Sequence, residues 1–289
     1  MIKTILVPAL GEADDESTFA TALEAARLVD GHLTFLHVRS DPAELLAAPS
    51  EGDLATGLSL PGFLSAYKRE AHARAERAKR AFERLSRRAH LPQLDAPSRA
   101  GGPSAEWREV RGHLTERLIA ESRFHDLLVL RAGKGASALS SDDIGAILIA
   151  AGRPLLLAPT APPKPMSGTA VVAWKETAEA ARALAAAMPL LAKAEKIVVL
   201  SVTEGHEPAG SSLKRLAAQL AWHGLKTSAR RIEPGKSGAA EALVAAAAKL
   251  EAGLLVAGGY GHSRLRELIF GGVTQRLLKG TGVPVLLFH

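Results

Sequence analysis

The sequence contains no cysteine and few aromatic residues. Without cysteine, the chain forms no disulfide bond and offers no thiolate nucleophile, and zinc sites that are built on cysteine are excluded. Aromatic residues make up 4% of the chain, which leaves little side-chain surface for stacking on nucleic-acid bases.

Long apolar runs are absent as well. No stretch approaches the roughly 20 apolar residues that a membrane-spanning helix needs. The opening residues, MIKTILVPALGEADD, contain an apolar run that is too short for a signal peptide, and they turn acidic at once. We therefore expect a cytoplasmic protein with no membrane partner.

The common motifs of catalysis and metal binding are also missing. The chain has no H-E-x-x-H motif and no carboxylate cluster at ligand spacing, so we expect no metal held by the protein alone. It has no G-x-x-x-x-G-K-[ST] motif and is therefore not a P-loop NTPase. His262 and Ser263 are neighbours, but no G-x-S-x-G elbow surrounds the serine, so we assign no catalytic residue.

The positive charge of the chain is concentrated in one segment. The net charge is +6, and many basic residues lie in residues 67–88. Apolar residues recur there at steps of three and four, which predicts an amphipathic helix: Leu64, Tyr67, Ala71, Ala75, Ala78, Phe82 and Leu85. The basic residues alternate with glutamates, so this face is predicted to be solvated, and we do not expect a nucleic-acid partner.

The chain consists of two related halves. Each half opens with an apolar strand, a turn, an Ala/Leu-rich helix and a second strand, and each later adds a helix and further strands. The late strands correspond in pairs, DLLVL with GLLVA and RPLLLAP with VPVLLF. The Pro-rich stretch at residues 160–168 reads as a linker. We predict domains at residues 1–160 and 165–289.

The strands are continuous apolar runs rather than alternating ones. Such strands are covered on both faces, as in parallel sheets. Alternation with helices predicts right-handed crossovers and an α/β fold, in which each half is a doubly wound, Rossmann-like α/β/α sandwich with a mainly parallel five-stranded sheet. Ligands of such sheets bind beyond the carboxyl ends of the strands, where the strand order reverses.

Glycines cluster after one of these strands. Gly258 and Gly261 follow the apolar run LLVA, nine residues intervene, and Gly271 and Gly272 precede a helix that is predicted to begin at about Val273. A helix N-terminus has unpaired N–H groups and a partial positive charge, so glycines in front of it leave room for a phosphate. The alternative is that the glycines only shape the turn and the entry to the helix.

This pattern resembles the nucleotide signature of the universal stress proteins. The signature is G-x-x-G, nine residues, then a glycine, a small residue and V-T, which this chain shows at Gly258, Gly261, Gly271, Gly272, Val273 and Thr274. The resemblance covers nearly the whole chain as a tandem protein with two such domains. It implies that glycine-motif members bind ATP without being conspicuous enzymes, and that the last strands of two such domains pair antiparallel.

The resemblance also implies further site residues in the second half. The backbone near Val202 would meet the adenine, and Ala173, Trp174 and Lys175 would follow the first strand of that half. The family has Asp at the position of Lys175, and this lysine either pairs with a phosphate or faces solvent. Trp174 packs either on the nucleotide or in the core.

Two departures from the family concern the phosphate and the first half. ATP-binding members have Ser or Thr where this chain has Gly272, although Thr274 still offers a hydroxyl. In the first half, Arg131 and Lys134 replace the first two glycines of the motif, and Leu10 replaces the ribose-binding Asp. The next helix of the first half begins SSDDIGAILIAAG, and Ser141 or Asp142 can cap it. The acidic pair at its start would repel a phosphate. We predict no nucleotide in the first half.

The function expected from this pattern is that of a stress-response regulator with one C-terminal site for an adenine nucleotide, ATP, with Mg²⁺ entering on its phosphates. An unknown protein partner, an intramolecular pseudo-dimer and a further homodimer belong to this expectation. The first alternative is a nucleotide-free interaction or scaffold protein. The second is a slow ATP hydrolase, for which the motif offers no evident general base.

Overall fold

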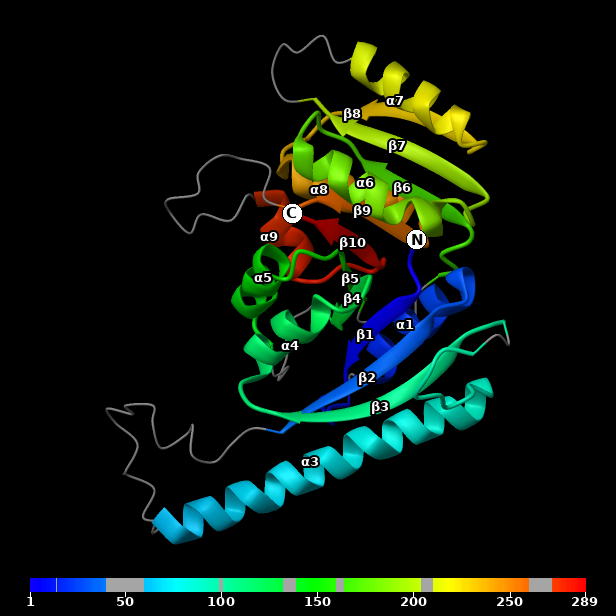
Figure 1. Cartoon of the computed structure of the whole chain (residues 1–289). Coiled ribbons are helices and arrows are strands. Elements are labelled where there is room, and N and C mark those ends of the chain that lie inside the picture. The colour runs from blue at the N-terminus through cyan, green and yellow to red at the C-terminus, as the bar shows by residue number, and fades with distance from the viewer. Residues whose placement is uncertain are drawn as a thin grey trace.

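The computed structural model describes residues 1–13, 15–39, 60–98, 101–131, 139–159, 164–203, 210–259 and 272–289. Its centre is one ten-stranded sheet with the order β3-β2-β1-β4-β5-β10-β9-β6-β7-β8 (Figure 1). The strands are β1 (Thr4–Pro8), β2 (His32–Arg39), β3 (Ser104–Arg111), β4 (Leu127–Arg131), β5 (Leu155–Ala158), β6 (Thr169–Ala173), β7 (Lys196–Val202), β8 (Thr227–Ile232), β9 (Leu254–Gly258) and β10 (Val285–Phe288).

The two halves of the chain meet inside this sheet. All pairs within β1–β5 and within β6–β10 are parallel, as the continuous apolar runs predict. β5 and β10 pair antiparallel, with Leu156 opposite Leu286. The antiparallel pairing expected of the two last strands is therefore confirmed within one chain, and it joins the two five-stranded sheets into one.

Helices cover both faces of the sheet and separate two buried clusters. One cluster includes residues of α1 (Asp15–Val29), α3 (Leu60–Ala89), α6 (Ala178–Leu191) and α7 (Gly210–Trp222). The other includes residues of α4 (Leu114–Ser122), α5 (Ser141–Ala150), α8 (Gly238–Lys249) and α9 (Gly272–Leu278). The fold is therefore a three-layer α/β/α sandwich, which confirms the predicted class. None of the helices described here is long and apolar enough to cross a membrane.

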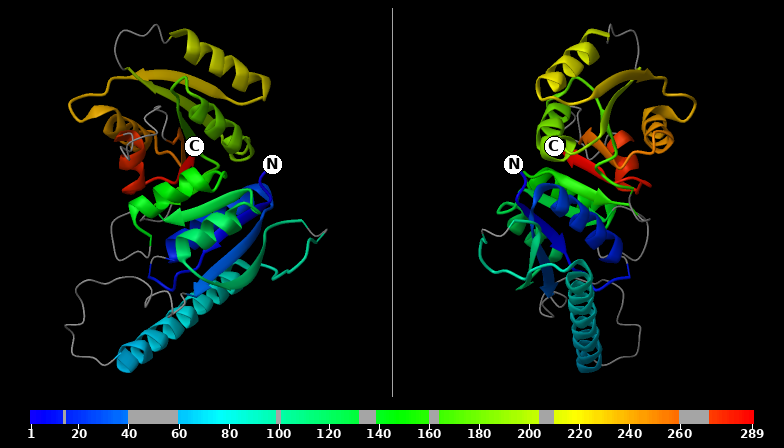
Figure 2. Two further views of the ribbon diagram at one scale, coloured as in Figure 1. Left: turned by 60° about the vertical axis from the view of Figure 1, so that its left-hand side comes forward. Right: turned by 90° about the vertical axis from the view of Figure 1, so that its right-hand side faces the viewer.

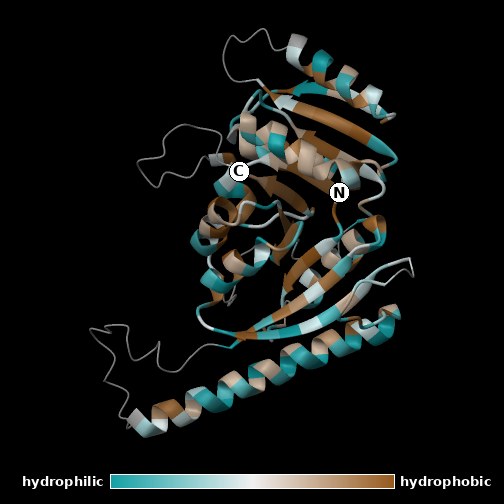
Figure 3. Ribbon diagram, viewed as in Figure 1, coloured by the Kyte–Doolittle hydropathy of each residue, from teal (hydrophilic) through white to brown (hydrophobic). Residues whose placement is uncertain are grey.

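Helix α3 matches the amphipathic pattern of its sequence. Ala75, Ala78 and Phe82 are buried, whereas Arg80 and Arg84 are exposed. The helix begins at Leu60, before the segment that the basic residues mark. Figure 3 shows its hydrophilic residues and, in contrast, the apolar strands of the sheet. The predicted solvated face is therefore present.

The start of α5 differs from its prediction. Ser140, one residue earlier than expected, caps this helix: its hydroxyl accepts from the Asp143 amide, and the Asp143 carboxylate accepts from the Ser140 amide. This reciprocal capping box satisfies two backbone donors that a cap at Ser141 or Asp142 would leave open.

The residues that lead into the second half, Lys164 to Met166, are bonded to residues of both halves. The amide of Met166 donates to Glu24 Oε1 on α1 at 2.5 Å. Lys164 Nζ lies 2.6 Å from Glu251 Oε1, beyond the end of α8. A Cβ at Gly253 would lie 2.0 Å from the Pro165 carbonyl oxygen, so glycine is required there for the chain to pass.

Candidate functional site

The strand order reverses between β6 and β9. From β6 the chain proceeds outward through β7 and β8, then returns to β9 on the other side of β6. The carboxyl ends of β6 and β9 are adjacent, because Val172 pairs with Val256. In open α/β sheets this is the place where ligands bind. Of the predicted site residues, Ala173 and Gly258 are the last residues of these two strands, and Trp174 and Lys175 follow β6.

The residues after β6 are held by backbone and side-chain hydrogen bonds. The Trp174 amide donates to the Leu200 carbonyl at 2.7 Å, and its indole Nε1 donates to Ser212 Oγ of α7 at 2.9 Å. Trp174 also packs against the buried cluster beside α6 and α7. Its ring therefore ties α7 to the sheet, which favours the structural interpretation of this tryptophan.

Lys175 lies exposed at the beginning of the loop that leads to α6. Its carbonyl oxygen accepts from the Thr177 amide at 2.7 Å, which turns the chain toward the helix. The Thr177 hydroxyl accepts from the Ala180 amide at 3.3 Å and caps α6. The loop thus supplies its own cap and places the Lys175 side chain outside the core.

Gly258 has a packing reason to be glycine. A Cβ built on this residue would lie 2.6 Å from the Ala180 backbone nitrogen in the first turn of α6. Such a contact is too short for any side chain, and its partner is backbone. The close approach of helix and strand therefore explains Gly258 without a ligand.

The next glycine packs against the other half of the chain. A Cβ at Gly259 would lie 2.8 Å from Leu148 Cδ2 of α5, and the Gly259 carbonyl oxygen lies 3.2 Å from His289 Nδ1. Gly259 is thus the place where the segment after β9 contacts the first half. Gly261 and Gly271 lie outside the described residues.

Gly272 differs from these two glycines because it faces open space. It begins α9, is exposed, and a Cβ built on it would meet no described atom within 4 Å. Val273 packs partly against the second buried cluster, and Thr274 is 3% exposed. Of the three predicted residues at the start of α9, Gly272 alone presents its backbone to solvent, while the Thr274 side chain lies inside the protein.

The end of β7 adds a residue that the motif does not contain. Val202 is partly buried and pairs with Ile232. Thr203 follows, and its Oγ1 is buried without a hydrogen-bond partner among the described residues. A buried hydroxyl usually has a partner, so Thr203 is a further polar group at this edge. Its position directly after an apolar strand was the signal available in the sequence.

The corresponding crevice of the first half is filled by the chain itself. Asp15 Oδ2 accepts from the Gly11 amide at 2.8 Å and Asp15 Oδ1 accepts from the Leu10 amide at 3.2 Å, both directly after β1. Asp15 is 4% exposed, and burial raises its pKa to about 6, against the lowering effect of the two amides. The Asp15 carboxylate thus already accepts the hydrogen bonds that these two amides could donate to a ligand.

Helix α3 and β2 close the same loop from the side. Arg77 Nε donates to the Gly11 carbonyl at 3.0 Å, and a Cβ at Gly11, whose φ is +72°, would lie 2.2 Å from the Arg74 carbonyl oxygen. His37 Nδ1 lies 2.7 Å from the Ala9 carbonyl, and burial lowers its pKa. The family resemblance pointed to Leu10 in this loop. The role of Asp15 was not predicted, because a single acidic residue at a helix start is common.

Arg131 occupies the place that corresponds to Gly258. It ends β4 and pairs with Ala158 of β5, as Gly258 ends β9 and pairs with Phe288 of β10. Burial lowers the pKa of Arg131, and the charge of nearby Glu12 opposes this effect. The structure therefore supports the alignment on which this substitution was inferred. Lys134 lies outside the described residues.

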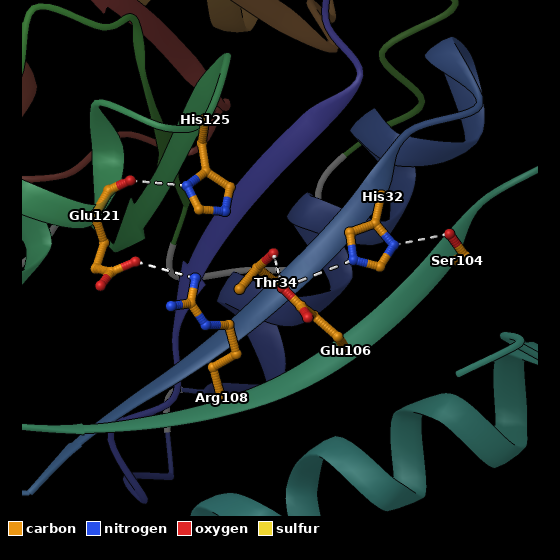
Figure 4. A network of polar contacts seen from close by, with 7 residues as sticks. All are labelled: His32, Thr34, Ser104, Glu106, Arg108, Glu121 and His125. Carbon is orange, nitrogen blue, oxygen red and sulfur yellow. Dashed lines mark hydrogen bonds and ion pairs between the residues drawn. The ribbon is translucent and has the colours of Figure 1, made fainter. Parts of the chain in front are cut away.

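A second polar cluster lies at the opposite edge of the sheet (Figure 4). His32 Nδ1 contacts Ser104 Oγ at 2.9 Å and Thr34 donates to Glu106 at 2.8 Å, near the amino ends of β2 and β3. Burial lowers the pKa of His32. These side chains satisfy one another across neighbouring strands, and within the described residues no group of three or more His, Cys, Asp or Glu could hold a metal. We interpret the cluster as structural.

Comparison with known families identifies the second half of the chain. Residues 166–289 match the universal stress protein family. The C-terminal half is a universal stress protein domain. The whole chain resembles a universal stress protein from Archaeoglobus fulgidus DSM 4304, with a TM-score of 0.66 and 14% identity over 99% of this chain and 95% of that one. The chain therefore has the fold of a tandem universal stress protein.

Another solved structure gives the same result for the fold. A functionally unknown protein from Pseudomonas aeruginosa PAO1 superposes with a TM-score of 0.56 and 18% identity, over 99% of this chain and 92% of that one. No curated protein matches the chain by sequence. The first half thus shares the fold of the universal stress protein domain, with its own side chains at the switch point.

Proposed function

We propose that the protein is a cytoplasmic stress-response regulator that binds an adenine nucleotide, ATP, in its C-terminal half. The observation that carries this proposal is the open backbone of Gly272 at the start of α9, in a universal stress protein domain. Exposed N–H groups at a helix start attract a phosphate. We also propose domain limits at residues 1–160 and 165–289.

The residues around β6, β7 and β9 suit the parts of such a ligand. Backbone groups at Val202 and the Thr203 hydroxyl are polar partners for a base, and the exposed Lys175 supplies a cation for phosphates. Gly261, Gly271 and Gly272 belong to the signature that would wrap the phosphates. A Mg²⁺ ion would be held by the nucleotide and not by a cluster of protein carboxylates.

The first half takes no nucleotide in this proposal. Asp15 already accepts from the amides of Leu10 and Gly11, and Arg131 fills the end of β4. A ligand at this loop would have to displace a carboxylate that is fixed by two backbone donors, and at the start of α5, which corresponds to α9, Asp143 already accepts from the Ser140 amide. The first half then acts through its pairing with the second and through a protein partner.

A nucleotide-free scaffold is the second candidate, and two observations favour it. Gly258 is explained by its contact with α6, and Thr274 is turned into the protein. Both residues therefore fit a fold that has kept the motif for packing alone. A slow ATP hydrolase ranks last, because the glycine motif offers no evident general base for water.

The deciding experiment measures ATP binding to the full chain by calorimetry, for the native protein and for Gly272→Val. Gly272 faces open space, so the valine should leave the fold intact while it covers the amides. We expect binding by the native protein and at least about a tenfold loss in the variant. Gly282→Val is the matched control, because Gly282 also has no neighbour within 4 Å and lies beyond α9.

Three results would contradict the proposal. Absence of heat with the native chain supports the scaffold, and equal affinities of the native chain and Gly272→Val place the nucleotide elsewhere. Phosphate release that follows protein concentration would instead support the hydrolase. Sedimentation of the same samples tests further dimerisation.

A further inference from the structure

Positive charge gathers at one edge of the sheet, on α7 and β8. Residues 210–238 contain six basic residues and a single acidic one, Glu233. All six basic side chains are exposed: Lys214, Arg215, Lys226, Arg230, Arg231 and Lys236. A net positive charge of this size on a short exposed segment indicates a binding surface for an anionic partner.

These basic side chains differ from those on α3. On α3, Arg77 lies 2.8 Å from Glu70, Arg80 lies 3.7 Å from Glu76 and Arg84 lies 3.9 Å from Glu16. By contrast, none of the six basic side chains on α7, on β8 and in the turns next to β8 forms an ion pair or side-chain hydrogen bond with another described residue. The charge on α3 is partly neutralised within the protein, whereas that on α7 and β8 is left for solvent or a partner.

Helix α7 also carries the most exposed tryptophan of the described chain. Its inner face, Leu213, Leu216 and Leu220, is buried against the sheet. Trp222 lies at its end with 92% of its surface exposed. Arg215 lies seven residues before Trp222, so both side chains project from one face of the helix. Trp222 therefore contributes nothing to the core and lies about two helical turns, roughly 10 Å, from Arg215 on the same face.

The position of this surface leaves it accessible. β8 is the last strand of the sheet order: two strand spacings, about 10 Å, separate it from β6, and one separates it from Val202 and Thr203 at the end of β7. α7 and α3 lie at opposite ends of the molecule in both views of Figure 2. A long ligand can thus lie along β8 and α7 without entering the crevice at β6 and β9.

We propose that the surface formed by α7 and β8 binds single-stranded nucleic acid. About four of these cations would pair with phosphates, and Trp222 would stack on a base, which is the combination that proteins use for single strands. An anionic membrane fits less well, because Ala218 and Gln219 surround the single tryptophan on the outer face of α7 and offer little apolar surface. The sequence directed attention to α3, but the unpaired charge and the free aromatic ring lie here.

The test is fluorescence anisotropy of a labelled oligothymidylate of about 20 nucleotides with the full chain at rising salt. If about four cations contact phosphates, the logarithm of the affinity should fall with the logarithm of salt concentration at a slope of about −3. Trp222→Ala should weaken binding about tenfold, and Trp222→Phe should restore most of it. Arg230→Ser combined with Arg231→Ser should reduce the slope by about 1.4.

Matched controls separate this surface from charge in general. Arg80→Ser combined with Arg84→Ser removes the same charge from α3 and should leave the affinity within about twofold. Saturating ATP should not displace the oligonucleotide, because Trp222 and the exposed cations lie beyond the crevice between β6 and β9. An oligonucleotide displaced by ATP, binding that ignores Trp222, or anisotropy that stays flat at about 50 mM salt would each overturn the proposal. Heparin or anionic vesicles that bind at least as tightly as the oligonucleotide would overturn it as well.

Discussion

The carboxylate of Asp15 accepts a hydrogen bond from the amide of Gly11 at 2.8 Å, in the loop after β1 that corresponds to the Lys175 loop after β6 in the second half. The same carboxylate accepts from the Leu10 amide, so both donors of this turn are used within the protein. A buried carboxylate here costs free energy when it is charged. This relationship makes the stability of the first half depend on pH.

Stability should therefore fall as the pH rises from about 4 to about 6. Burial raises the pKa of Asp15 from 3.8 to about 6, so within this window the unfolded chain loses its proton before the folded chain does. The folded state is favoured below the window, and this contribution, about 3 kcal/mol, is lost above it. Urea unfolding at several pH values measures the change.

The control for this prediction is the neighbouring exposed carboxylate. Asp15→Asn should flatten the stability curve between pH 4 and 6, whereas Glu16→Gln should leave it unchanged. Parallel curves for the native protein and Asp15→Asn would show that Asp15 does not titrate in this range.

Glycines 258, 259 and 272 should respond to substitution by alanine in a graded way. Gly258→Ala puts a methyl group 2.6 Å from backbone and should cost about 3 kcal/mol. Gly259→Ala meets the end of the Leu148 side chain, which can shift, so its cost should be smaller. Gly272→Ala should be nearly neutral, and thermal unfolding of the three variants gives the order. An equal loss for all three would contradict this explanation.

Much of the fold could be predicted because burial leaves a direct trace in sequence. The runs LLVL and LLVA, with both faces covered, indicated parallel strands, whereas the domain limits drawn at the Pro-rich stretch stay a prediction. The joining of two sheets into one came only from the family resemblance. The pairing of two edge strands depends on how the two sheets meet in space. Nothing in the sequence around Leu156 or Leu286 indicates that these two residues pair.

The candidate site was less accessible to sequence reasoning. The spacing of the glycines identified the cluster. It could not distinguish Gly258, which allows α6 to pack closely on β9, from Gly272, which is exposed to solvent. Asp15 and Trp222 were missed for a similar reason. Their roles depend on what lies near them in space, namely two amides in one case and open solvent with cations in the other.

Restoring a hydroxyl at position 272 should strengthen nucleotide binding. The resemblance to ATP-binding universal stress proteins implies Ser or Thr at this position, and Gly272→Ser adds a donor to an exposed helix start without a clash. A hydrogen bond to a charged group is worth about 2 kcal/mol, so we expect roughly a tenfold gain in ATP affinity. Calorimetry with ATP and with adenosine separates phosphate from base contacts, because adenosine affinity should not change. A gain that is equal for adenosine would place the new contact away from the phosphates.

The two halves should unfold as one unit, because β5 and β10 share the centre of the sheet. Leu156 and Leu286 face each other there and are fully buried. Leu286→Ala should cost about 3 kcal/mol through the cavity that it leaves. Trp107 reports on the first half and Trp174 on the second, so Trp107→Phe and Trp174→Phe, each combined with Trp222→Phe, allow each half to be followed by fluorescence in urea. Both probes should shift to lower urea together in Leu286→Ala. A shift confined to Trp174 would mean that the antiparallel pair does not couple the halves, since the first half would then keep its full stability after its neighbour has unfolded.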